Sequence, residues 1–336
     1  SRIAVSRSDI DRVGTDPVVF SFNNYVATGV TDRIEYRGAY ELGDGVTLFA
    51  GLEHEHVRSS TSYEGAAPDR ASNRMTGGYV QVSLHPLNWL TLTGGVRHDH
   101  YSDYGGHTTL GGNIAYSPNG GATVLRATYA EGFRAPTLTE GQPPYGNPAL
   151  KPETARNLDI GIEQHLLDGT ASLALTWYRR RSTDLITFSF ASFMSENIGR
   201  VEADGIELGL VLRPVPRLRI EANYARANAV NRSAPNDGKR LPLRPRDTAH
   251  LTADWDTPLG LKLGATLTLV GDSFDDNANL VRIDGYGRVD VRVSMPLGER
   301  LELFGRFDNL TGERYETVSG YATPGRAVFA GARLRI

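Results

Sequence analysis

Cysteine is absent from this chain of 336 residues. Its absence excludes disulfide bonds, thiolate metal sites and cysteine nucleophiles. Long apolar runs are absent too, because no stretch approaches the roughly 18 residues that a membrane helix needs. Neither sign of charge dominates, since the net charge is -3. A helical membrane protein is therefore excluded, and without a basic field no nucleic-acid partner is expected.

A period-two pattern is what the sequence does have, and it is clear in the stretch that starts at Gly285. One face of this stretch carries Val289, Val291, Val293 and Met295, and the other carries Arg288, Asp290, Arg292 and Ser294. Such alternation predicts a strand with one apolar face. In a soluble sandwich that face meets a second sheet, whereas in an outer-membrane barrel it meets lipid and the polar face lines the lumen.

The spacing of turns and loops favours the barrel. About sixteen candidate strands follow one another, each near the length of a tilted membrane strand. Short turns, such as 43–45 and 167–169, alternate with polar loops, such as 132–154, 195–199 and 231–245. The predicted fold is all-β, an antiparallel up-and-down transmembrane β-barrel with its long loops outside. The alternative is a secreted sandwich or propeller, but no blade repeat of about 40 to 50 residues occurs.

The barrel prediction also assigns a lipid face, in which apolar residues alternate with polar residues that face water. Trp89 and Trp255 lie beside short turns, and tyrosines such as Tyr101 and Tyr104 lie near long loops, which fits two aromatic girdles. The predicted lipid-facing residues are Val289, Val291, Val293, Leu261, Leu263, Leu267, Leu269, Leu208, Leu210, Leu158, Ile160 and Ile162.

Three short motifs could carry chemistry, and each has a plainer interpretation. Alternate histidines at 54–56 and 98–100 suggest a metal, but they continue apolar rows, which places them where the outward face meets headgroups. Ser273 lies in an esterase-like GDSF motif that lacks a positioned base. The acidic loop at 272–277 lacks the spacing of an EF-hand. We therefore expect no metal site, no cofactor and no enzymatic activity.

Two longer motifs point to a family. Residues 131–138 read EGFRAPTL and residues 147–153 read NPALKPE, and together they resemble the mid-barrel signature of TonB-dependent outer-membrane receptors. Residues 201–207, 308–310 and 314–326 resemble the later strands of that family. The stretch from Asp275 to Tyr286 is most similar to vitamin B12 receptors, although siderophore receptors share much of it.

The resemblance implies a barrel of about 22 strands and an N-terminal plug that contacts the TonB complex. No plug is recognisable, so residues 1–336 are expected to be a C-terminal portion of such a barrel in the outer membrane of a Gram-negative bacterium. The implied function is energy-coupled uptake of a metal chelate, cobalamin first and a ferric siderophore second. A passive porin remains the other alternative.

Inward-facing polar groups near long loops are the expected contacts for a bulky chelate. Arg244 and Arg246 share the parity of His250 and follow the loop from Asn231, so both are expected at the outer mouth. The plainer interpretation is that they hold the loop or bind lipopolysaccharide phosphates, since outer-membrane lipid and lipopolysaccharide are also expected partners. The other residues predicted to bind ligand are Asp275, Asp276 and Tyr286.

Overall fold

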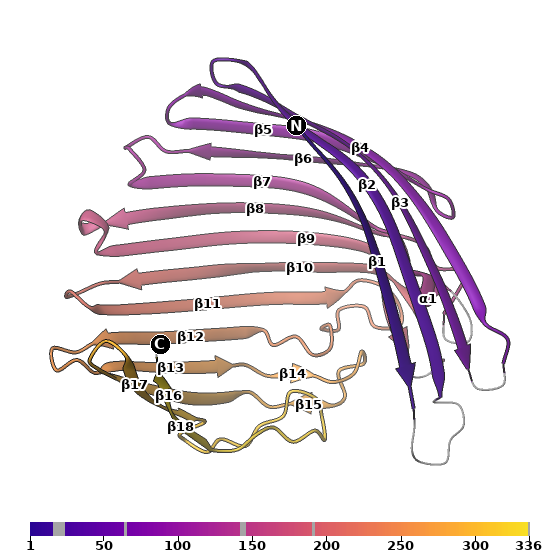
Figure 1. The fold of residues 1–336 in the computed structure, drawn as a ribbon. Helices are drawn as coiled ribbons and strands as arrows, with labels where there is room; N and C mark the ends of the chain where they lie inside the picture. The colour runs from indigo at the N-terminus through magenta and orange to yellow at the C-terminus, as the bar shows by residue number, and fades with distance from the viewer. Residues whose placement is uncertain (16–23, 64–65, 142–145, 190–191, 335–336) are drawn as a thin grey trace. The chain divides into compact units, whose positions relative to one another are not determined.

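The computed structural model describes residues 1–15, 24–63, 66–141, 146–189 and 192–334. The prolines at 143 and 144 of the predicted long loop lie outside these ranges. Sixteen strands form one antiparallel sheet in which sequence neighbours are also sheet neighbours, as Figure 1 shows. Among the described residues, no helix is long and apolar enough to cross a membrane.

The strands of the large sheet have the following bounds: β1 (Arg2–Gly14), β2 (Tyr25–Gly43), β3 (Val46–Tyr63), β4 (Asp69–Leu87), β5 (Leu90–Tyr101), β6 (Gly105–Tyr116), β7 (Thr123–Arg134), β8 (Glu153–Leu166), β9 (Ala171–Ser189), β10 (Met194–Leu212), β11 (Leu218–Asn231), β12 (Asp247–Asp256), β13 (Lys262–Val270), β16 (Tyr286–Leu297), β17 (Leu301–Asp308) and β18 (Ala327–Leu334). The smaller elements are the helix α1 (Leu138–Gly141), the 3-10 turn η1 (Leu167–Gly169) and a two-stranded sheet of β14 (Ser273–Phe274) and β15 (Arg282–Ile283).

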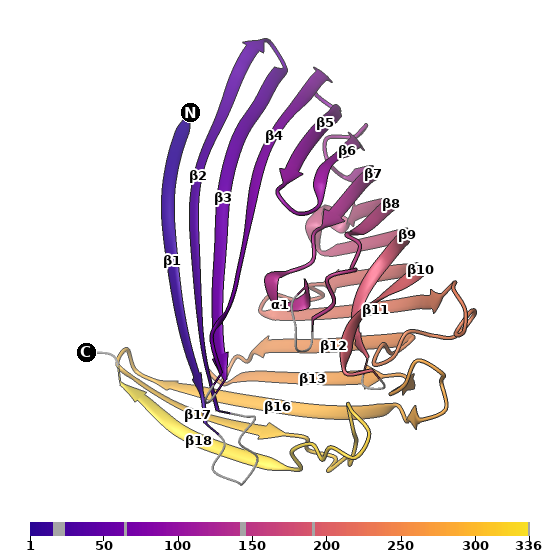
Figure 2. The ribbon, with the colours of Figure 1, turned by 90° about the vertical axis from the view of Figure 1, so that its right-hand side faces the viewer.

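The chain divides into two compact units. Unit 1 contains residues 1–114, 128–157 and 182–200, and unit 2 contains residues 115–127, 158–181 and 201–336. Within unit 1, β1, β2 and β3 lie side by side in both Figure 1 and Figure 2. Their register places Leu52 opposite Tyr36 on one side and opposite Gly78 on the other.

The two faces of unit 1 differ in chemistry. One face carries apolar residues that are exposed in the structure, among them Leu52, Val80 and Val96 at 66%, 47% and 44%. The opposite face carries ion pairs that link β2 and β5 to Glu53 of β3. Arg33 contacts Glu53 at 2.8 Å, and Arg97 contacts the same carboxylate at 3.3 Å.

Unit 2 repeats this division, and the register confirms the predicted alternation. Leu267 of β13 lies opposite Leu251 of β12 and Val289 of β16. Thr266, on the other face, lies opposite Thr252 and Asp290. In β17 and β18 the polar face includes two aromatic rings, since the guanidinium of Arg306 lies 4.5 Å from the ring centroid of Phe329 and that of Arg333 lies 5.6 Å from Phe304.

The structure corrects three predicted links. The polar composition of Asp103, Tyr104, Gly105 and Gly106 predicts a long loop after Tyr101, but this link is short, because β6 already begins at Gly105. The loop predicted at 195–199 is strand, because β10 begins at Met194. The acidic loop after β13 contains the β14 and β15 hairpin. In each case hydrogen bonds to a neighbouring strand override polar composition, which alone predicts a loop.

Candidate functional site

Three long links of unit 2 pack against one another at one end of the strands, opposite the end that carries the short turns. They are residues 232–246, 271–285 and 309–326. The amide of Leu243 donates to the carbonyl of Phe274 (2.7 Å), which joins the first link to the second. The amide of Ser319 donates to Oδ1 of Asp275 (3.2 Å), which joins the third link to the second. We call these three links the outer loop cluster.

Arg240 of the first link contacts the second link through both its side chain and its backbone. Its Nη1 donates to Oδ2 of Asp272 (3.0 Å), and its Nη2 donates to the carbonyl of the same residue (2.7 Å). Its backbone amide donates to Oδ1 of Asn279 (2.7 Å), and its guanidinium lies 5.2 Å from the ring centroid of Phe274. Sequence reasoning missed Arg240, because its partners lie 32 to 39 residues away along the chain.

The predicted ligand residues Asp275 and Asp276 are both engaged within the loops. Oδ1 of Asp276 accepts from the amides of Leu280 (2.9 Å) and Val281 (2.8 Å), and Oδ2 accepts from Ala278 (3.0 Å). The amide of Val281 contributes most to lowering the pKa of Asp276 below its ordinary value. Asp276 thus stabilises the turn at 276–281, whereas Asp275 accepts a hydrogen bond from the third link. Among the described residues, no group of three or more histidine, aspartate or glutamate side chains could hold a metal.

Tyr286, another predicted ligand residue, stacks on Tyr315 with ring centroids 4.0 Å apart. Arg288 stabilises the stack, because its Nη1 donates a hydrogen bond to the hydroxyl of Tyr315 (3.1 Å). Beside it lies a cavity of about 580 Å³ between the second and third links. The cavity is lined by charged, hydroxyl-bearing and aromatic side chains, which include Arg282, Asp284, Arg314, Tyr315, Glu316 and Thr323.

Arg244 and Arg246 are both exposed at the end of the first link, three residues and one residue before β12 respectively. The carbonyl of Arg246 accepts from the amide of Ala227 (2.8 Å), which fixes the backbone there. In the described part of the chain neither guanidinium forms an ion pair. The register confirms that His250 lies on the polar face, opposite Asn223 and Thr268. Both arginines therefore lie next to the outer end of β12, and their contact with a ligand stays a prediction.

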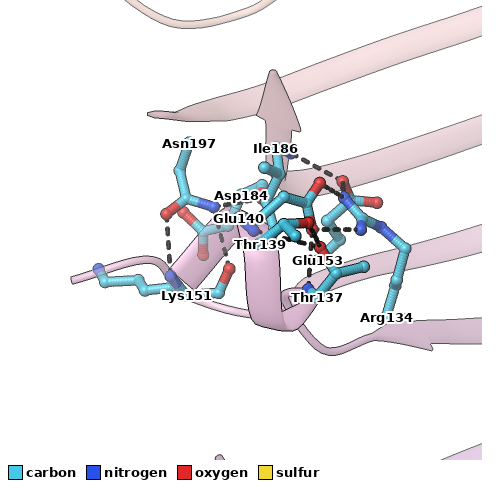
Figure 3. Close-up of polar contacts among 9 residues, drawn as sticks. All are labelled: Arg134, Thr137, Thr139, Glu140, Lys151, Glu153, Asp184, Ile186 and Asn197. Carbon is cyan, nitrogen blue, oxygen red and sulfur yellow. Dashed lines mark hydrogen bonds and ion pairs between the residues drawn. The ribbon is translucent and has the colours of Figure 1, made fainter. Parts of the chain in front are cut away.

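Unit 1 contains the signature motif, and the structure explains its residues (Figure 3). Nη1 and Nη2 of Arg134 donate to the two carboxylate oxygens of Glu140 (2.8 and 3.1 Å). Nη2 also donates to Oε1 of Glu153 (2.6 Å), which in turn accepts from the amide of Ile186 (2.7 Å). The motif therefore ties β7, α1, β8 and β9 together at the outer end of the strands.

The side-chain amide of Asn197 forms a second set of hydrogen bonds beside this network. Nδ2 of Asn197 donates to the carbonyls of Lys151 (3.0 Å) and Asp184 (2.6 Å), and Oδ1 accepts from the Lys151 amide (2.9 Å). Asp184 has a φ of 56°, so the strand needs this local support. Burial alone would raise the pKa of Glu140, but hydrogen bonds from Arg134 and Thr137 hold it below its ordinary value of 4.5.

Comparison with known proteins identifies the class. Residues 5–310 match the family described as TonB dependent receptor-like, beta-barrel, and the chain belongs to that family. The family places the chain in the outer membrane of Gram-negative bacteria, and its members are receptors rather than enzymes. The apolar face of each unit is therefore the lipid face.

Three known proteins show what this chain is similar to. The vitamin B12 transporter of Photobacterium profundum is 29% identical over 314 residues, which are 88% of this chain and 48% of that protein. The chain thus spans about half the length of this curated relative. The ferric enterobactin receptor of Pseudomonas aeruginosa, in complex with enterobactin, shares the fold at a TM-score of 0.80 and 19% identity, covering 99% of this chain and 59% of that one. The ferric yersiniabactin uptake receptor of Yersinia pestis gives 0.73 and 20%, with 93% and 55% covered.

Proposed function

We propose that this chain is the C-terminal barrel portion of a receptor that takes up cobalamin across the outer membrane. The observation that carries the proposal is the 29% identity to a vitamin B12 transporter over 88% of the chain. The outer loop cluster supplies a place for capture, because it holds exposed cations and a polar cavity of about 580 Å³ at the end of the strands.

The alternative substrate is a ferric siderophore. It is favoured by the solved structures that share the fold, which include receptors for ferric enterobactin and ferric yersiniabactin. Ferric siderophores of the catecholate type are anionic, and the unpaired guanidiniums of Arg244 and Arg246 offer charge complementarity. Both substrates are bulky chelates, so both require capture by loops before passage. Passage itself would depend on a plug and on the TonB complex, which we propose as the partner.

The test is ligand binding by the full-length receptor that carries this chain. The double variant Arg244→Ala with Arg246→Ala is expected to weaken binding by about tenfold, since one or two charge-assisted hydrogen bonds are lost. Equilibrium binding of cobalamin and of ferric enterobactin, measured on purified protein, identifies the substrate. A matched control is Arg213→Ala with Arg300→Ala, two exposed arginines beside short turns at the other end of the strands.

Tight binding of cobalamin that falls in the double variant and persists in the control supports the proposal. Tight binding of ferric enterobactin with no binding of cobalamin selects the siderophore instead. Equal affinities in wild type and double variant, for either compound, would remove Arg244 and Arg246 from the site. Surface levels are measured in parallel, so that a folding defect is not mistaken for a binding defect.

A further inference from the structure

Four of the chain's eight histidines lie on the lipid face of unit 1. They are His54 and His56 of β3 and His98 and His100 of β5, and we call them the histidine belt. The register connects them across β4: His54 and His100 lie on either side of Thr76, His98 lies opposite Gly78, and His56 lies opposite Arg74.

The histidine belt lies where the apolar rows end on the side of the outer links. Along β3 the belt follows Leu48, Ala50 and Leu52, and along β5 it follows Leu92 and Val96. From Val46, the first residue of β3, to His54 the strand rises roughly 27 Å at about 3.4 Å per residue. With a strand tilt of about 40°, this is roughly 21 Å along the membrane normal, near the top of an apolar band about 25 Å tall. The belt is therefore level with the headgroups of the outer leaflet.

Local hydrogen bonds leave one nitrogen of the imidazole available in two members of the belt. The Nδ1 atoms of His54 and His98 each contact a threonine hydroxyl at 2.8 Å, that of Thr76 and that of Thr108 respectively. Within the described residues, Nε2 of neither ring forms a hydrogen bond, so it can contact another partner. Gly106 leaves room for His98, because a Cβ at this position would lie 3.1 Å from its Nε2.

The surrounding charges favour an anion. Arg74 is exposed, and its guanidinium forms no ion pair in the part of the chain that the structure describes. The nearby carboxylate of Asp32 on β2 is paired with Arg58 and contacts Arg7 at 3.6 Å. From the other side, Glu131 of β7 accepts from the amide of Leu110 (3.1 Å) and from the hydroxyl of Tyr129 (2.7 Å). The belt and Arg74 thus face the lipid with their neighbouring carboxylates already engaged.

We propose that the histidine belt and Arg74 bind the phosphate groups of a phosphorylated outer-leaflet lipid. The guanidinium donates charge-assisted hydrogen bonds to phosphate oxygens, and an imidazole N–H donates to them as well. A zinc site fits less well, because the described residues bring together no group of three or more possible metal ligands.

Native mass spectrometry of the full-length receptor in mixed micelles tests this site, with lipid A as the probe and dephosphorylated lipid A as its matched control. The variant in which His54, His56, His98 and His100 are all changed to Gln keeps polarity but loses the imidazole rings. We expect its affinity for lipid A to fall about tenfold. The single variant Arg74→Gln is also expected to weaken binding.

The control variant changes His85 and His250 to Gln, one beside a short turn and one on the polar face. It should retain lipid A as wild type does. Equal retention of lipid A by the belt variant and wild type would overturn the proposal. So would equal retention of lipid A and its dephosphorylated form by wild type, or loss of binding on addition of EDTA, which would indicate a metal. Thermal unfolding of every variant separates loss of lipid from loss of fold.

Discussion

Leu267→Arg, compared with Thr266→Arg, tests which face of unit 2 meets lipid. Leu267 is the sixth residue of β13, roughly 17 Å along the strand from Lys262 at about 3.4 Å per residue. At a tilt of about 40° this is roughly 13 Å along the membrane normal, close to the middle of a band about 25 Å tall. Its neighbours Leu251 and Val289 offer no charge. An arginine there should cost the full 2 to 4 kcal/mol, roughly, that is measured at the bilayer midplane.

Thr266→Arg adds the same side chain on the other face, directly opposite Asp290. Asp290 already pairs with Arg288 (3.1 Å), but a guanidinium on this polar face stays in water, so the cost should be small, about 1 kcal/mol or less in either direction. The difference of at least about 1 kcal/mol corresponds to roughly fivefold or more in the ratio of folded to unfolded protein. Urea unfolding of the full-length receptor in lipid vesicles measures it. Equal destabilisation by the two substitutions would refute the assignment of the lipid face.

Three further outcomes are expected. Glu153→Ala leaves Arg134 with one carboxylate partner and the Ile186 amide with none, so hydrogen exchange of that amide should speed up by roughly tenfold to a hundredfold, while Glu299→Ala in a short turn changes nothing. The folded-state pKa of Glu140 lies below its ordinary value of 4.5. The contribution of Glu140 to stability is therefore complete above about pH 4.5 and is lost as pH falls through the lowered pKa. Protection of the loop around Glu140 against proteolysis should fall over the same pH range. Gly312→Ala should destabilise by about 1 kcal/mol in urea unfolding, since φ is 72° there.

Much of the fold was predictable because one rule covers all of it. A residue in a strand points to the side opposite its neighbours, so the alternation of Leu267 with Thr266 predicts both faces, and the register confirms it. The strand ends were less predictable. Gly105, Gly106 and Ser195 have the composition of loop residues, yet cross-strand hydrogen bonds keep them in strands. Composition reports local preference and not the presence of a partner strand.

The candidate site was only partly predictable for the same reason. Tyr286 follows a loop and precedes a strand, so its position at the outer end of β16 could be read from the sequence. Its stacking on Tyr315 could not, because the two rings are brought together by links that are far apart in the chain. Arg240 also needs its distant partners to be recognised. Whether Asp275, Asp276 and Tyr286 contact a ligand stays a prediction.

Uptake of labelled cobalamin is the most direct test of the proposed function. Cells that lack other cobalamin receptors would express the full-length receptor, and uptake would be measured with and without an uncoupler that dissipates the proton gradient. The proposal predicts saturable uptake that the uncoupler abolishes, while cobalamin already bound at the cell surface remains bound. Uptake that rises in proportion to concentration and persists with the uncoupler would contradict it and indicate a passive pore.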